Sequence, residues 1–242
     1  MFGSLAAWAA TIRENFDRWF WVGDETGAEQ ELRPDLVNCT QIYKDSVGSE
    51  RSWPDYQLRP NYCITLALAA DLTSPPRAWA ALQTVVRRLL GPLGVATLDS
   101  QDWAYRGQYN NSDQGSDPST AHGANYHQGP EWVWPVGFLL RALETAASRL
   151  GEAELQSCHA TLRTTLSLLH AHLAASDWLG LPELTNAGGA ECRQATSAEL
   201  SRQRIVHFEA VKRTSRGNQY FHLQAVQLPK SASFPCNLTS NR

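Results

Sequence analysis

Apolar side chains recur at spacings of three and four residues along much of the chain, and this periodicity limits the possible folds more than any other feature. In the longest such segment, Leu155, Leu162, Leu166 and Leu173 fall on one face of a helix. Segments of this kind, together with one shorter apolar run, cover residues 5–21, 62–72, 76–91, 131–150 and 153–174. The alternation typical of half-buried strands is weak throughout. The sequence therefore predicts an all-α fold of paired amphipathic helices.

Long polar segments rich in Gly, Asn, Asp and Trp separate these helices. They span residues 22–60, 94–130 and 175–196. Structureless loops of this length are uncommon in a compact domain and are usually functional. We therefore expect the helices to provide a scaffold and the connecting loops to carry the chemistry.

The composition excludes several classes of protein. The 242 residues have a net charge of −3 and only 19% are charged, so the basic surface of a nucleic-acid-binding protein is absent. No apolar run is long enough to span a membrane, and residues 1–22 lack the basic start of a signal peptide. Five scattered cysteines, an odd number, have no metal-ligand spacing and are typical of a reducing compartment. We expect a cytoplasmic protein with no cofactor, no metal, and no nucleic-acid or membrane partner.

The first candidate binding segment is residues 42–61, IYKDSVGSERSWPDYQLRPN. Asp55, Arg59 and Asn61 lie close together there, next to a Trp. An Arg fork and an Asp carboxylate can together hold the vicinal hydroxyls of a sugar. The alternative is a loop that begins a helix, with Asp55 as its cap and Pro60 in its first turn.

The second candidate is residues 124–135, ANYHQGPEWVWP. A Trp ring can cover the apolar face of a pyranose while neighbouring polar groups bind its edge. Trp132 or Trp134 suits the first role, and Asn125, His127 and Gln128 suit the second. In the alternative, the Trp side chains fill a gap between two helices and Glu131 is an acid of the first helical turn, favoured by the helix dipole.

The third candidate is residues 177–189, DWLGLPELTNAGG. Glu183 lies between Pro182 and the apolar Leu184, which predicts a stiffly held and partly desolvated carboxylate. Such a group suits a general base that acts on water. The alternative is an exposed loop acid that precedes a Thr-Asn turn.

In order along the chain, IYKDS, DYQLRPN, LLGPLGVATLD, NYHQGPEWVWP and GLPELTN resemble the C-terminal amylo-α-1,6-glucosidase region of eukaryotic glycogen debranching enzymes. The resemblance extends from about residue 5 to about residue 195. It implies a six-hairpin glycosidase-like fold, an (α/α)6 barrel with long functional loops, of which this chain is a part. It also implies hydrolysis of the single α-1,6-linked glucose left at a trimmed branch of glycogen or a limit dextrin.

The resemblance implies roles for individual residues as well. Glu183 in LPELTN looks like the general base, which activates water on the face opposite the leaving oxygen. The positions that look like sugar-binding residues are Asp55, Arg59, Asn61, His127, Gln128 and Trp132. An inverting mechanism needs a second carboxyl group as the acid, about 6.5–9.5 Å from the base. In the family this acid is an Asp in a motif that precedes the segments present here.

The chain departs from the family pattern after Ala195, and the α-1,4-glucanotransferase part of debranching enzymes is absent. We expect residues 1–196 to be the C-terminal part of a glucosidase domain and residues 197–242 to be a divergent, basic and poorly ordered tail. Part of a barrel leaves helix faces uncovered, which favours self-association. The alternative to debranching is a non-catalytic carbohydrate-binding or truncated fragment that lacks the general acid.

Overall fold

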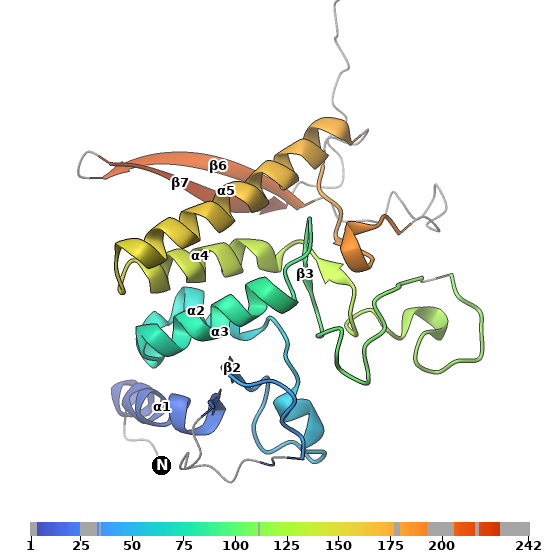
Figure 1. Cartoon of the computed structure of the whole chain (residues 1–242), viewed down its shortest axis with the longest axis horizontal. Coiled ribbons are helices and arrows are strands. Elements are labelled where there is room, and N and C mark those ends of the chain that lie inside the picture. The colour runs from blue at the N-terminus through green and yellow to red at the C-terminus, as the bar shows by residue number, and fades with distance from the viewer. Residues whose placement is uncertain are drawn as a thin grey trace, which may run out of the picture.

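The computed structural model describes residues 4–24, 33, 35–110, 112–176 and 180–192, and the backbone of 206–215 and 218–227. Helices form most of the framework. They are α1 (Leu5–Phe20), α2 (Tyr62–Leu68), α3 (Pro75–Arg88), α4 (Pro135–Ala147) and α5 (Glu152–Ala175). Figure 1 shows α5, α4 and α3 following one another in layers, and both figures show α1 at the far end from α5.

The helices begin at residues that suit a helix start. The Ser4 Oγ accepts a hydrogen bond from the Ala7 N–H at 3.2 Å and so caps α1. Pro75 and Pro135 occupy the first turns of α3 and α4, where a missing backbone N–H costs little. The helices predicted from the periodicity are therefore confirmed, together with the early position of Pro135.

One predicted helix starts later than expected. The segment 131–150 is helical only from Pro135 onward. Residues 131–132 form a strand instead, because their backbone hydrogen-bonds to strands on both sides. The apolar run 62–72 is divided between α2 and a 3-10 turn, Ala70–Leu72.

The core forms where α4 packs against α2, α3 and α5. Leu82 and Val85 of α3 and Leu139 and Leu143 of α4 are completely buried. Their spacing of three or four residues is the predicted apolar stripe. Burying a side chain of this size contributes about 1.5–3 kcal/mol. These contacts fix the ends of the helices from which the functional loops extend.

Short antiparallel strands connect the loops. β1 (Trp21–Val22) pairs with β2 (Ile42–Tyr43). A second sheet has the order β3 (Val95–Ala96), β4 (Glu131–Trp132) and β5 (Leu184–Thr185). The predicted helical framework is thus correct. β2, β3 and β5 occupy segments that were expected to be structureless loops, whereas β4 lies at the start of a segment that was expected to be helical. Two residues per strand are too few to produce a detectable alternation.

The C-terminal segment contains β6 (Val206–Ser215) and β7 (Asn218–Gln227), which pair in antiparallel register. The division of the chain at residue 196 stays a prediction. Within the described residues, no helix combines the length and the apolar character required to cross a membrane.

Candidate functional site

The three candidate segments come together around the β3–β4–β5 sheet. The central strand β4 pairs with β5 in a register that places Trp132 opposite Leu184. Just beyond the pairing, the Val133 N–H donates to the Glu183 carbonyl at 3.1 Å. The second and third segments therefore lie side by side, and Glu183 stands immediately before β5.

Glu183 has a fixed backbone and a free side chain. It is half-buried, between Leu181 and Leu184, which are 3% and 6% exposed. Within the described part of the chain its carboxylate has no hydrogen-bond or ion-pair partner. A carboxylate in this situation can accept a proton from a water molecule or bind a hydroxyl donor.

Arg59 uses all of its N–H donors inside the protein. Nε and Nη2 donate to Gln57 Oε1 at 3.1 and 2.9 Å, and Nη2 also donates to Gln128 Oε1 at 2.9 Å. Nη1 donates to the carbonyls of Thr97 and His127 at 3.0 and 2.8 Å. These bonds engage all five N–H donors of the guanidinium and join the first candidate segment to the second. Sugar binding by Arg59 and Gln128 stays a prediction.

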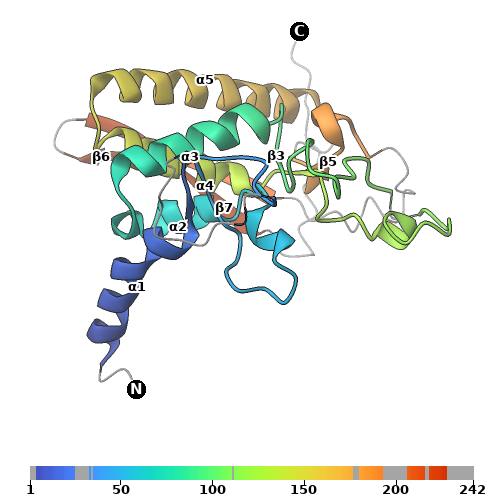
Figure 2. The same ribbon diagram turned by 60° about the horizontal axis from the view of Figure 1, so that its bottom comes forward.

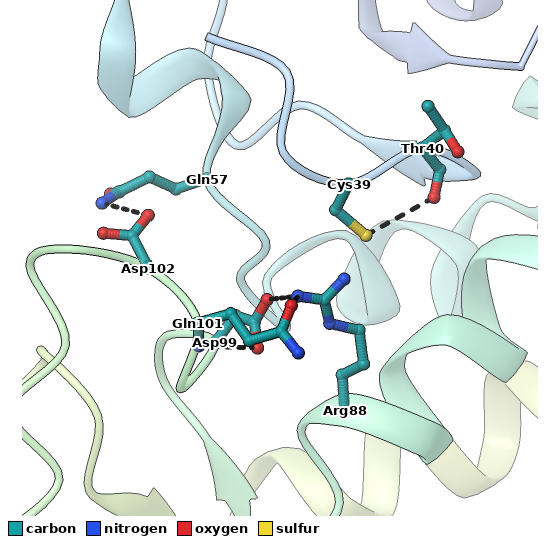
Figure 3. A network of polar contacts seen from close by, with 7 residues as sticks. All are labelled: Cys39, Thr40, Gln57, Arg88, Asp99, Gln101 and Asp102. Atoms are coloured by element: carbon teal, nitrogen blue, oxygen red, sulfur yellow. Dashed lines mark hydrogen bonds and ion pairs between the residues drawn. The ribbon is translucent and has the colours of Figure 1, made fainter.

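A buried carboxylate extends this network. The Gln57 Nε2 donates to Asp102 Oδ2 at 3.0 Å, and these residues are only 3% and 8% exposed. Figure 3 shows the two side chains pointing toward one another, near the ion pair of Arg88 with Asp99. Burial lowers the pKa of Arg59, because desolvation disfavours its charge, while nearby carboxylates act in the opposite direction.

His127 and Trp132 form a ring stack, with centroids 4.9 Å apart and planes at 22°. Tyr126 packs edge-on against both rings, at 4.8 and 4.6 Å. Trp132 is 7% exposed and its indole N–H donates to the Tyr126 carbonyl at 3.0 Å, whereas His127 is exposed. An approaching sugar would meet His127 before Trp132. The assignment of both as sugar-binding residues stays a prediction.

Asp55 and Asn61 contact their own loops. The buried Asp55 carboxylate accepts from Ser46 Oγ, Gly48 N–H and Ser49 N–H, at 2.7, 2.9 and 3.3 Å. Burial acts to raise the pKa of Asp55, but these hydrogen bonds outweigh it and hold the pKa below its ordinary value. The exposed Asn61 donates to Asp45 Oδ1 at 2.7 Å. Both side chains thus already have partners, and sugar binding by them also stays a prediction.

Glu131 is a buried carboxylate that the sequence pattern did not reveal. It lies on β4 and is 6% exposed, so the alternative that made it an acid of the first helical turn is wrong. It accepts from the Gly188 N–H at 2.8 Å and from Thr185 Oγ1 at 3.3 Å. Burial raises its pKa and these hydrogen bonds oppose the rise. A side chain at Gly91 would collide with the carboxylate, so that glycine is a signal of this burial.

Residues 105–109 form a further part of the assembly, which the sequence analysis left within a loop. The Asn186 Oδ1 of the third segment accepts from the Tyr109 N–H at 2.7 Å. Asn125 of the second segment is completely buried and donates to two carbonyls of 105–109, at 2.9 and 2.7 Å. The described residues contain no group of three or more side chains that could hold a metal ion.

These contacts define a helix-rich protein in which connecting loops gather a free carboxylate, stacked rings and an amide network. The chain belongs to the amylo-alpha-1,6-glucosidase family, whose family model matches residues 3–200. The resemblance carried by the motifs is thereby confirmed. Over 203 residues the chain is 35% identical to the glycogen debranching enzyme of Saccharomyces cerevisiae. The alignment covers 79% of this chain and 13% of the yeast protein, so the chain matches a small part of a much longer relative.

Proposed function

We propose that the chain provides the general base and part of the sugar-binding loops of a glucosidase that removes the α-1,6-linked glucose at glycogen branch points. The observation that carries this proposal is the meeting of the three candidate segments. Arg59 joins the first to the second, and β4–β5 pairing joins the second to the third. Glu183 lies beside this junction, and among the described residues nothing bonds to its carboxylate oxygens. The family and the name of the yeast relative support the same reaction.

In this reaction Glu183 takes a proton from a water molecule as the water oxygen bonds to the anomeric carbon of the branch glucose. The bond from that carbon to the leaving oxygen breaks on the opposite face. The pairing of β5 fixes the backbone of the base, and such positioning lowers the barrier by holding the reacting groups in place. Inversion requires an acid about 6.5–9.5 Å away to protonate the leaving oxygen. By the resemblance, that acid is an Asp from a motif preceding these segments.

We assign the predicted sugar-binding residues to two groups, those that touch the sugar and those that position the loops around it. His127 is the residue best placed to touch a sugar, because its ring is exposed and is held by the stack on Trp132. Arg59, Gln128 and Asp55 act through the loops they hold together. Asn61, which is exposed, is available for contact with a longer substrate if it exchanges its bond to Asp45.

The proposed architecture is part of an (α/α)6 barrel, formed by residues 1–196, with residues 197–242 as a separate tail. The layered helices and the end of the family match at residue 200 support this division. A cytoplasmic location is also proposed. The described cysteines Cys39, Cys63, Cys158 and Cys192 are free, as expected in a reducing compartment.

The test is a chimera in which this chain replaces the matching segment of the yeast glycogen debranching enzyme. Glucose release from a phosphorylase limit dextrin is measured for the chimera, for Glu183→Gln, and for Glu191→Gln. The expected loss for Glu183→Gln is at least about 10²-fold, because general acid-base catalysis contributes about 10²–10⁴-fold. Glu191 is an exposed acid that lies eight residues further along the chain, beyond β5, and is the control.

Each outcome has a defined meaning. Full activity of Glu183→Gln would remove the assignment of the base. Glycogen binding by the chimera without any Glu183-dependent glucose release would favour the carbohydrate-binding alternative. Equal losses in Glu183→Gln and Glu191→Gln would show that the loop tolerates no change of charge and would also contradict the specific role of Glu183.

A further inference from the structure

Two Trp side chains outside the predicted glucose pocket form a pair at the surface, in which Trp103 is exposed and Trp53 is half-buried. Trp53 and Trp103 lie edge to face, with ring centroids 5.1 Å apart and planes at 66°. Trp103 is 72% exposed, whereas the exposed Trp8 and Trp19 of α1 are 49% and 47% exposed. Leaving apolar ring surface in water is unfavourable, and adjacent exposed rings are a common feature of binding surfaces.

The backbone that carries Trp103 is firmly held. Asp102, which precedes it, donates its N–H to the Asp99 carbonyl at 3.0 Å and accepts from the Ala104 N–H through Oδ1 at 2.8 Å. The Trp103 carbonyl itself accepts from Arg106 Nη1 at 3.1 Å. An exposed ring on a fixed turn loses little conformational freedom when a ligand covers it, so the entropic cost of binding there is small.

The Trp pair is connected to the proposed glucose pocket through a series of hydrogen bonds, of which Figure 3 shows the one between Gln57 and Asp102. Asp102 bonds to Gln57, which bonds to Arg59, and Arg59 reaches the His127 carbonyl. On the other side, Trp53 belongs to the same 3-10 turn as Asp55. The turns that carry the two rings are therefore held to the same framework as the loops of the proposed pocket.

We propose that Trp53 and Trp103 form a subsite for an α-1,4-linked glucan chain, the polymer that carries the branch glucose. Each pyranose presents an apolar face of C–H groups to a flat ring, and its hydroxyls stay in water. A neutral polymer needs no charged partner, and the two rings offer none. This inference rests on the proposed function, because it places the main chain of the substrate beside the pocket for its branch.

The test measures maltoheptaose binding to the full chain by isothermal titration calorimetry. Trp103→Ala should weaken binding about tenfold, which corresponds to about 1.4 kcal/mol, because it removes the flat apolar ring on which the sugar rests. Trp103→Tyr should restore most of the affinity because it returns a flat ring. Trp19→Ala, which removes an exposed Trp from α1, should leave the affinity unchanged. Because Trp103 is largely exposed, its replacement should leave the urea unfolding midpoint nearly unchanged.

Unchanged affinity of Trp103→Ala would overturn the subsite, as would the absence of maltoheptaose binding by the wild-type chain. Equal losses in Trp103→Ala and Trp19→Ala would also overturn it, because they would indicate unspecific ring contacts. The glucose-release chimera separates this result from the proposed reaction. If glucose release depends on Glu183 but maltoheptaose binding does not depend on Trp103, only the subsite is overturned. If binding depends on Trp103 but no glucose is released, the subsite stands and the catalytic role of Glu183 is overturned.

Discussion

Glu131 supports the loop that carries Glu183, the proposed general base, without taking part in the reaction itself. Its carboxylate is buried between the Gly91 turn and the turn that follows Glu183, and no Lys or Arg among the described residues pairs with it. Hydrogen bonds to a charged group contribute about 1.5–3 kcal/mol each, and desolvation of the carboxylate offsets much of that gain. Glu131 therefore acts mainly by positioning, because its carboxylate holds the Gly188 N–H and the Thr185 side chain in place.

Replacing Glu131 separates its hydrogen bonds from its charge. Glu131→Ala removes the acceptor of the Gly188 N–H and of the hydroxyl of Thr185, a residue that is only 2% exposed, and should reduce the free energy of unfolding by about 1–3 kcal/mol. Glu131→Gln retains an acceptor oxygen and should cost less. Urea unfolding of both variants and of the wild-type chain measures the difference. Equal losses in the two variants would contradict the role of the hydrogen bond.

The charge of Glu131 should appear in the pH dependence of stability. Its pKa is raised in the folded chain, mainly by burial, so the folded state holds the proton more tightly than the unfolded state does. Its contribution to wild-type stability must therefore decrease as pH rises from the ordinary Glu pKa of about 4.3 through the folded value. Relative to the wild type, Glu131→Gln should gain stability over this interval. Parallel pH profiles for the two proteins would show that Glu131 ionises in the folded state as it does in the unfolded state.

Arg59 is a second residue whose role can be measured. Lys has three donors on one atom and cannot bond to the side chains of Gln57 and Gln128 and to two carbonyls at once. We expect Arg59→Lys to lower the free energy of unfolding by about 1.5–3 kcal/mol, measured in urea. The control is Arg33→Lys, because the exposed ion pair of Arg33 with Asp35 should contribute little. A loss for Arg59→Lys no larger than that of the control would contradict the network.

At the scale of elements, the helices were predictable and the sheet was not. Leu139 and Leu143 repeat at the helical period, so sequence alone reveals the buried face of α4. β4 has only two residues, and its conformation depends on Val95 and Leu184, which lie far away in the sequence. The motif resemblance named three segments that the fold brings together, but it did not reveal their contacts. The bonds of Arg59 to two backbone carbonyls and two Gln side chains depend on the fold and could not be read from the residue type.

Gly129, in the second segment, packs closely against the backbone of residues 105–109. Gly129 has φ of +138°, and a Cβ there would lie 2.8 Å from the Gly107 nitrogen. We expect Gly129→Ala to reduce the free energy of unfolding by about 2–4 kcal/mol, from backbone strain and overpacking together. Gly48 also has a positive φ, of +76°, but has open space around it, so Gly48→Ala should cost only about 1 kcal/mol. Similar losses in the two variants, measured by urea unfolding, would show that the close approach has no energetic effect.

At the scale of the whole molecule, α1 is attached by its C-terminal half. Phe16 packs against Phe20 and Tyr43, with centroids 5.1 and 5.4 Å away. Nearer the N-terminus, Leu5 and Ile12 are 80% and 39% exposed although they share the same helix face. Figure 2 shows this part of α1 extending away from the other helices. An apolar helix face that the described residues leave open is a surface for association.

We therefore expect the isolated chain to associate with itself through this face in a concentration-dependent manner. A single helix face is small compared with a stable dimer interface, so the association should be weak. Leu5→Glu combined with Ile12→Glu should shift the sedimentation coefficient toward that of the monomer, because each charge would have to be buried on association. Leu168→Glu, which changes an exposed apolar residue of α5, is the control. Association that persists in the double variant, or that Leu168→Glu reduces equally, would show that the face of α1 does not drive it, and helical circular dichroism would verify that each variant remains folded.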